Sequence, residues 1–231
     1  MEGARRKGLL GGLAGVWLSS TLYGAIVMAR SPLAPRIPLA LALAFAVAVF
    51  PLSFLAWRDT GRRLVYTLAG SALALILAVA GLPCSLLPAL GSAAFLLVGL
   101  LGGGELLIVF GGAAVGSIGG LLACISAQSP LLGVLPLAYH VVSIGKATVR
   151  VTGNRAYTPL WLGVWASLLG ASLLLGPGAA AVIALDGASR LLEQATGLDA
   201  RLSPKKYGII ETIRIMLALP LLALAATPGG A

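Results

Sequence analysis

Residues 203–226 read SPKKYGIIETIRIMLALPLLALAA, and this stretch decides the fold class. Serine followed by proline is typical of a helix start, because the Ser203 hydroxyl can accept a bond from a free backbone N–H while Pro204 needs no acceptor. The apolar run that follows matches the ~20 residues that cross a bilayer core of ~30 Å. Tyr207 and two lysines stand where such a helix would meet the membrane surface. We therefore expect a transmembrane helix over 204–226.

The rest of the chain repeats this pattern. Hydrophobic residues make up 59% of the 231 residues and charged residues 10%, with a mean hydropathy of +1.02. A water-soluble domain of this size does not tolerate such a composition on its surface. The expected fold class is all-α, with one integral membrane domain over 1–231 built as a polytopic bundle of about nine helices. The expected helices span 8–29, 37–57, 64–82, 85–102, 105–124, 130–149, 158–176, 178–193 and 204–226.

Eight helices is the main alternative, because 178–193 is short and contains Asp186 and Arg190. At the N-terminus, a basic segment precedes an apolar run, as in a signal peptide. That run continues for about 22 residues without a clear small-residue cleavage site, which favours a retained first helix.

Charges are strongly segregated along this topology. With a cytoplasmic N-terminus, every Lys and Arg except Arg30 and Arg36 falls on the cytoplasmic side, together with all seven acidic residues. This is the distribution of the positive-inside rule. The expected localisation is the cell membrane, multi-pass, with the N-terminus inside. The net charge of +9 then favours contact with anionic membrane lipids, because each basic residue near the surface contributes ~1 kcal/mol of attraction. No nucleic-acid partner is expected.

Ionisable residues also enter the membrane spans. Asp186 would lie ~12 Å below the outer end of its helix, with Arg190 one turn further on. Glu211 and Arg214 have a similar spacing in the last helix. Charges at such depth indicate a functional site, or else internal ion pairs that stabilise the bundle. A tilted or shallow eighth helix would instead leave Asp186 in the interface.

Basic residues gather at the cytoplasmic ends of the second, third and sixth helices, where they suit a phosphate or carboxylate. His140, the only histidine, is either a hydrogen-bonded core residue or part of the polar lining. The expected anion ligands are Arg58, Arg62, Arg63, Lys146 and Arg150. The expected polar lining of the cavity is Asp59, His140, Asp186, Arg190, Glu211 and Arg214.

Two further patterns concern packing. Gly112, Gly116 and Gly120 form overlapping GxxxG steps, which predict a close helix–helix seam or a dimer interface. Cys84 and Cys124 both map to outer helix ends, where they are either two buried thiols or a disulfide. The sequence does not decide the oligomeric state.

Catalytic signatures are absent from the sequence. There is no Walker loop and no acidic run for Mg²⁺, and one histidine cannot supply bis-histidine haem ligation. No metal or cofactor is therefore expected, and enzymatic activity stays open. If the protein is an enzyme, a lipid-phosphate or prenyl transferase is expected.

Several stretches together resemble the YwiC-like family of uncharacterised prokaryotic membrane proteins. They are Phe50-Pro51-Leu52 with the arginines that follow, Glu105-Leu106-Leu107, the 143–150 region and Pro204-Lys205-Lys206-Tyr207-Gly208-Ile209-Ile210-Glu211. The resemblance implies a prokaryotic multi-pass membrane protein and no particular activity.

Nine helices with an inside N-terminus also resemble UbiA-type prenyltransferases, so a UbiA-like arrangement is compatible with the chain. In that superfamily, two cytoplasmic loops hold Asp-rich motifs that bind a Mg²⁺–diphosphate. The corresponding loops here are basic, with Asp59 as the sole acid. We therefore expect a cytoplasm-facing polar cavity that binds an anionic lipid or isoprenoid phosphate directly through cations. The alternative is a small-solute or proton-coupled transporter that uses His140, Asp186 and Glu211 as a relay.

Overall fold

The computed structural model describes residues 2–31, 37–58, 61–102 and 111–227, and within these ranges the chain is helical, with no β-strand. The all-α prediction is confirmed. Most helix boundaries lie within a few residues of the expected ones. The described helices are α1 (Glu2–Arg30), α2 (Leu39–Arg58), α3 (Arg63–Ala80), α4 (Leu86–Gly102), α6 (Gly112–Gly116), α7 (Ile118–Ala127), α8 (Pro130–Thr152), α9 (Tyr157–Leu173), α10 (Pro177–Thr196), α11 (Leu198–Arg201) and α12 (Pro204–Ala226).

Two departures from the expected helices are local. The fifth expected helix begins at residue 105, outside the described residues, and its described part is interrupted at Ser117 between α6 and α7. The short helix α11 occupies a segment that we expected to be a loop. The proline-led starts behave as expected, since the Ser129 and Ser203 side chains accept hydrogen bonds from backbone N–H groups at the start of α8 and α12.

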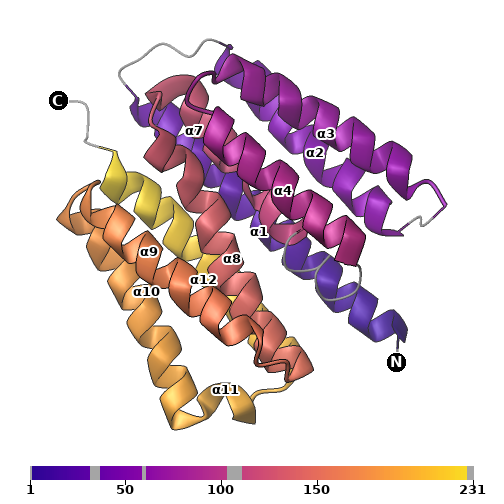
Figure 1. Cartoon of the computed structure of the whole chain (residues 1–231), viewed down its shortest axis with the longest axis vertical. Coiled ribbons are helices and arrows are strands. Elements are labelled where there is room, and N and C mark those ends of the chain that lie inside the picture. The colour runs from indigo at the N-terminus through magenta and orange to yellow at the C-terminus, as the bar shows by residue number, and fades with distance from the viewer. Residues whose placement is uncertain (1, 32–36, 59–60, 103–110, 228–231) are drawn as a thin grey trace.

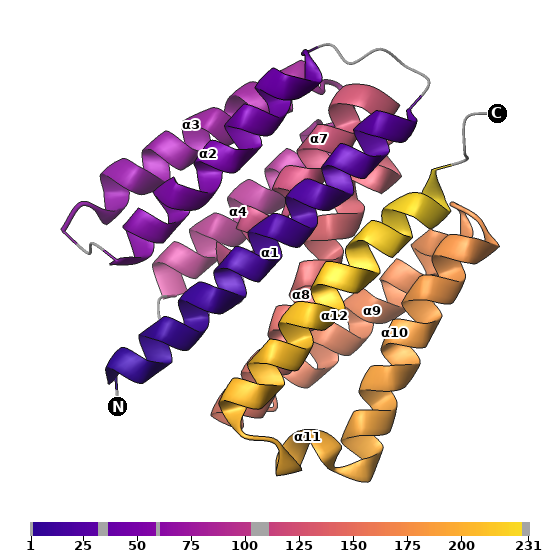
Figure 2. The same cartoon turned by 180° about the vertical axis from the view of Figure 1, so that it is seen from behind.

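The helices form two groups around α1 and α7. Helices α2, α3 and α4 lie on one side, and α8, α9, α10 and α12 lie on the other (Figure 1). The reverse view shows α1 between α2 and α12 (Figure 2). Helices α1 and α7 lie between the two groups, and α4 also packs directly against α8, where Phe95 contacts the cluster of Leu137 and Val141.

The two ends of the bundle differ in charge. The N-terminal end of α1 and the α2–α3, α8–α9 and α10–α12 connections lie toward one end, and the C-terminal ends of α1 and α12 lie at the other (Figure 1). Arg62, Arg155, Arg201 and Lys206 are exposed residues of the first end. At the second end, Arg30 donates hydrogen bonds to the side chain and carbonyl of Thr227.

The exterior is strongly apolar. Large hydrophobic side chains are exposed on both groups of helices, including Leu101 (80%), Leu174 (82%) and Leu185 (72%). Among the described residues, two stretches are long and apolar enough to cross a membrane by length and composition, Pro130–Arg150 and Lys206–Ala226. Several other apolar helices are shorter, including Leu64–Ala80 and Leu86–Leu101.

Glycine permits the closest contacts of the core. A Cβ on Gly120 would lie 1.8 Å from the carbonyl oxygen of Gly133. A Cβ on Gly116 would lie 2.0 Å from the His140 ring, and one on Gly112 would meet Ile144 at 2.8 Å. The predicted glycine stripe therefore faces α8 within the chain, and the packing-seam interpretation is confirmed.

Cys84 and Cys124 form a disulfide in the structure. It joins the α3–α4 turn to α7, with a Cα–Cα distance of 5.5 Å that is ordinary for a disulfide. Of the two alternatives left open by the sequence, buried thiols or a disulfide, the structure has the disulfide.

Candidate functional site

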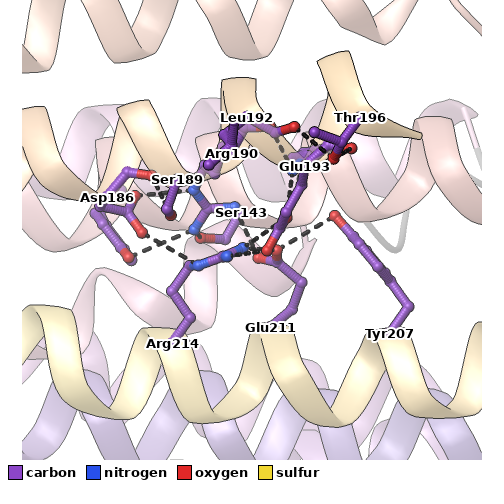
Figure 3. Close-up of polar contacts among 12 residues, drawn as sticks. Ser143, Asp186, Ser189, Arg190, Leu192, Glu193, Thr196, Tyr207, Glu211 and Arg214 are labelled. Carbon is purple, nitrogen blue, oxygen red and sulfur yellow. Dashed lines mark hydrogen bonds and ion pairs between the residues drawn. The ribbon is translucent and has the colours of Figure 1, made fainter. Parts of the chain in front are cut away.

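Six charged side chains from α8, α10 and α12 form one largely buried cluster, which we call the ion-pair network. Figure 3 shows the α10 and α12 members facing each other across the space between these two helices. The members are Lys146 from α8, Asp186, Arg190 and Glu193 from α10, and Glu211 and Arg214 from α12.

Arg190 lies at the centre of the ion-pair network, and its side chain has no exposed surface. Its Nε donates to Asp186 Oδ2 at 2.8 Å, and its Nη1 donates to Glu211 Oε2 at 2.7 Å. Its Nη2 donates to the Ser143 hydroxyl at 2.7 Å and lies 3.4 Å from the Tyr139 hydroxyl. One guanidinium therefore joins all three helices, a task that suits its planar set of donors.

The remaining ion pairs extend from this centre. Arg214 pairs closely with Glu211 on its own helix and with Glu193 on α10, and its Nε lies 3.5 Å from Asp186 Oδ1. Lys146 Nζ pairs with Glu193 Oε2 at 2.8 Å and donates to the Arg190 carbonyl at 3.1 Å. Every carboxylate thus faces two cations.

The ion-pair network is balanced, with three cations against three carboxylates. A charge buried away from water is tolerated only when it is paired and hydrogen-bonded. The Tyr207 hydroxyl adds a hydrogen bond to Glu211 Oε1 at 3.2 Å. Because the charges neutralise one another, the cluster can hold α8, α10 and α12 together without a bound ion.

The structure shows both of the ion pairs that the sequence suggested, Asp186 with Arg190 and Glu211 with Arg214. It also joins them to each other, which the sequence did not specify. Asp186 is 9% exposed and lies nine residues after Pro177, or ~13 Å along the axis of α10. The Asp186 side chain is therefore buried inside the helix bundle.

The structure does not bring the expected anion ligands that it describes together at one site. Lys146 is 3% exposed and belongs to the ion-pair network. Arg150 is partly buried and donates to the Leu202 carbonyl at 2.6 Å. Arg62 is exposed at the start of α3, and α3 lies on the other side of α1 from α12 (Figure 2). The side chains of Arg58 and Arg63, and the whole of Asp59, lie outside the described residues.

His140 is buried apart from the ion-pair network. Its side chain packs against Gly116 of α6, and neither ring nitrogen has a hydrogen-bond partner within the described part of the chain. His140 is therefore a core residue, as one of the two alternatives held, but the hydrogen bond expected for it is not found among the described residues. A relay from His140 to Asp186 has no hydrogen bond to carry it in this structure, because Asp186 is paired with arginines alone.

Four members of the site were missed at the sequence level: Glu193, Tyr139, Ser143 and Tyr207. The signal was present in the spacing. Each helix carries three polar residues at i, i+4 and i+7, the spacing that places side chains on one face. The triplets are Tyr139–Ser143–Lys146, Asp186–Arg190–Glu193 and Tyr207–Glu211–Arg214.

Two cavities lie outside the ion-pair network. One, of about 110 Å³, lies among α2, α3, α4 and α6. The other, of about 250 Å³, lies between α8 and α9 and has an apolar lining that includes Leu131, Val134 and Ala138. Among the residues that the structure describes, no group of three His, Cys, Asp or Glu side chains could hold a metal ion.

The chain matches no family model, no curated protein and no solved structure. Its function must therefore be inferred from its own geometry.

Proposed function

We propose that the protein is a multi-pass membrane protein whose charged end faces the cytoplasm and binds an anionic lipid or isoprenoid phosphate. The observation that carries the proposal is the inverted polarity of α10. Its buried side includes Asp186 and Arg190, while Leu185 (72%) and Leu192 (65%) are exposed. In water, such a helix would bury its charges and expose its apolar surface, whereas in lipid each face meets a favourable partner.

The two ends of the bundle support the orientation. The sequence places nearly all cations at the cytoplasmic ends of the expected spans, and the connections that carry them gather at one end of the fold (Figure 1). Cytoplasmic ends of membrane proteins carry such an excess of Lys and Arg. The disulfide joins elements at the opposite, expected outer side, where oxidising conditions favour it.

The ligand assignment rests on where the sequence concentrates its arginines. Lys146 is paired with Glu193, and Arg150 already donates to a backbone carbonyl. The α2–α3 connection has three arginines, Arg58, Arg62 and Arg63, in six residues, and this density makes it the main candidate for a phosphate. Arginine suits this role because its planar guanidinium can bind phosphate oxygens in pairs.

The membrane assignment is tested by fractionation and by fusion reporters. We expect the protein to stay with membranes through an alkaline carbonate wash and to be released by detergent. Alkaline phosphatase fused after Ala231 should be active, because that end is expected outside, and a fluorescent protein fused before Met1 should fluoresce. Release by carbonate, or the reverse pattern of fusion activities, would count against the proposal.

The ligand assignment is tested by vesicle flotation with polyprenyl phosphate or phosphatidic acid in the presence of EDTA. Because arginines would bind the headgroup directly, we expect chelation to leave binding unchanged. Replacing Arg58, Arg62 and Arg63 together by glutamine should weaken binding about tenfold or more, since charge-assisted hydrogen bonds contribute ~1.5–3 kcal/mol each. The exposed Arg155 gives a control variant, Arg155→Gln, which should bind as the native protein does. Strict dependence on Mg²⁺ would contradict direct binding.

A transporter is the second candidate, and the buried ion-pair network is the observation in its favour. Ionisable groups inside a membrane span often mark an ion or substrate path. Reconstituted vesicles with an internal pH dye would test it: a proton flux abolished by Glu211→Gln would favour transport over lipid binding.

A further inference from the structure

Glu193 is the outermost carboxylate of the ion-pair network. Its side chain is 17% exposed, whereas those of Asp186 and Glu211 are each 5% exposed. It lies three residues before the end of α10 at Thr196, ~4.5 Å along the helix axis. Among the described residues, Arg190 pairs with the other two carboxylates and not with Glu193. Glu193 can therefore leave the network without breaking the ion pairs of the central guanidinium.

Two cations, Lys146 and Arg214, hold the Glu193 carboxylate, and we call them the carboxylate clamp. Arg214 Nη2 pairs closely with Oε1, its Nη1 lies 3.4 Å from Oε2, and Lys146 Nζ donates to Oε2 at 2.8 Å (Figure 3). Two donors of one guanidinium on two carboxylate oxygens is the geometry in which arginine binds a free carboxylate. Lys146 also donates to the Arg190 carbonyl, and Arg214 also pairs with Glu211. The clamp is therefore held in place by contacts other than Glu193.

The surface around the carboxylate clamp is apolar. The Arg214 side chain is 14% exposed, and Ile210 and Leu217 lie four residues before it and three after it, on the same side of α12. These two side chains are 36% and 59% exposed, and Leu192, which adjoins Glu193 on α10, is 65% exposed. In the membrane placement proposed above, such side chains meet lipid chains. A ligand that enters the clamp between α10 and α12 therefore comes from the bilayer.

We propose that the carboxylate clamp binds the carboxylate of a fatty acid, which replaces Glu193 while the fatty acid chain stays in the lipid beside α10 and α12. The exchange puts one carboxylate in the place of another, so the network keeps three cations against three carboxylates. No buried charge then loses its partner, which would be the costly outcome. The displaced Glu193 side chain turns toward the charged end of the bundle. The inference rests on the membrane placement in the proposed function and not on the α2–α3 arginines.

Binding of oleate to the full-length protein in an uncharged detergent tests the exchange. Glu193→Gln removes the competing carboxylate, and we expect it to tighten oleate binding about tenfold or more. Glu211→Gln is the matched control: it removes the same charge from an inner position, leaves Glu193 in the clamp, and should tighten binding by less than about threefold. Lys146→Met removes one cation of the clamp and should weaken binding about tenfold. Equal gains from the two glutamine variants would overturn the proposal, because net charge alone would then attract the carboxylate.

Photolabelling of the native protein gives a readout that does not depend on the folding of a variant. A fatty acid with a diazirine close to its carboxylate should label peptides from α10 or α12. Excess oleate should abolish this labelling, whereas uncharged methyl oleate and the water-soluble carboxylate hexanoate should not. Labelling confined to other helices, or equal competition by methyl oleate or by hexanoate, would overturn the assignment. Flotation with phosphatidic acid vesicles tests the proposed function separately, so that each result can fail without the other.

Discussion

Replacing Arg190 by methionine is expected to destabilise the folded protein by about 3–5 kcal/mol, the effect of removing one partner from a buried ion pair. The guanidinium makes hydrogen bonds to Asp186, Glu211 and Ser143 and has no exposed surface. Its loss leaves three carboxylates facing two cations and removes the link between α8, α10 and α12. Unfolding by a denaturing detergent in mixed micelles would measure the change.

Two further variants separate the effect of an unpaired buried charge on stability from other effects of replacing an arginine by methionine. Arg155→Met removes an exposed cation and should change the free energy of unfolding by less than about 1 kcal/mol. Adding Glu211→Gln to Arg190→Met restores the charge balance and should recover part of the lost stability, because a neutral amide is less costly to bury. If Arg190→Met were as stable as the native protein, the ion-pair network would not be buried as the structure has it.

The second large effect is expected at Gly120. An alanine there would place its Cβ 1.8 Å from the Gly133 carbonyl oxygen, a contact that only a shift of α7 against α8 can relieve. We expect Gly120→Ala to destabilise the protein at or above the upper end of the ~1–3 kcal/mol typical of overpacking. Unfolding by a denaturing detergent in mixed micelles would measure this change as well.

Gly170 provides the matched control for this prediction. It lies in α9, and a Cβ there would have no neighbour within 4 Å. Gly170→Ala should therefore be neutral or stabilising by about 0.5–1 kcal/mol, the preference of a helix interior for alanine over glycine. Equal destabilisation by both variants would show that the close approach of α7 and α8 is not the cause.

The helices were predictable because apolar runs and helix-start signals are local. Ser203–Pro204 and Ser129–Pro130 begin α12 and α8 as their residue types require. The interruption at Ser117 was not predictable, because it depends on a partner far along the chain. Ser20 of α1 donates to the Gly116 carbonyl and accepts from the Gly119 N–H across the interruption.

The candidate site was predictable within each helix and not between helices. Spacing alone paired Asp186 with Arg190 and Glu211 with Arg214, since both pairs lie on single helices. The choice of Glu193 as the partner of Lys146 depends on how α8 packs against α10, which no local pattern contains. Local patterns also did not show that the basic residues of the α2–α3 connection lie apart from those of α8. The two segments belong to different groups of helices (Figure 1).

The central claim, an apolar exterior in lipid around an internal ion-pair network, is tested most directly on α10. A spin label on Leu185→Cys, in the full chain reconstituted in a bilayer, would report collisions with dissolved oxygen and with a water-soluble nickel chelate. Leu185 is 72% exposed and adjoins Asp186, which is 9% exposed. The account predicts frequent collisions with oxygen and few with nickel, as for a lipid-facing site. Frequent collisions with nickel at this position would contradict it.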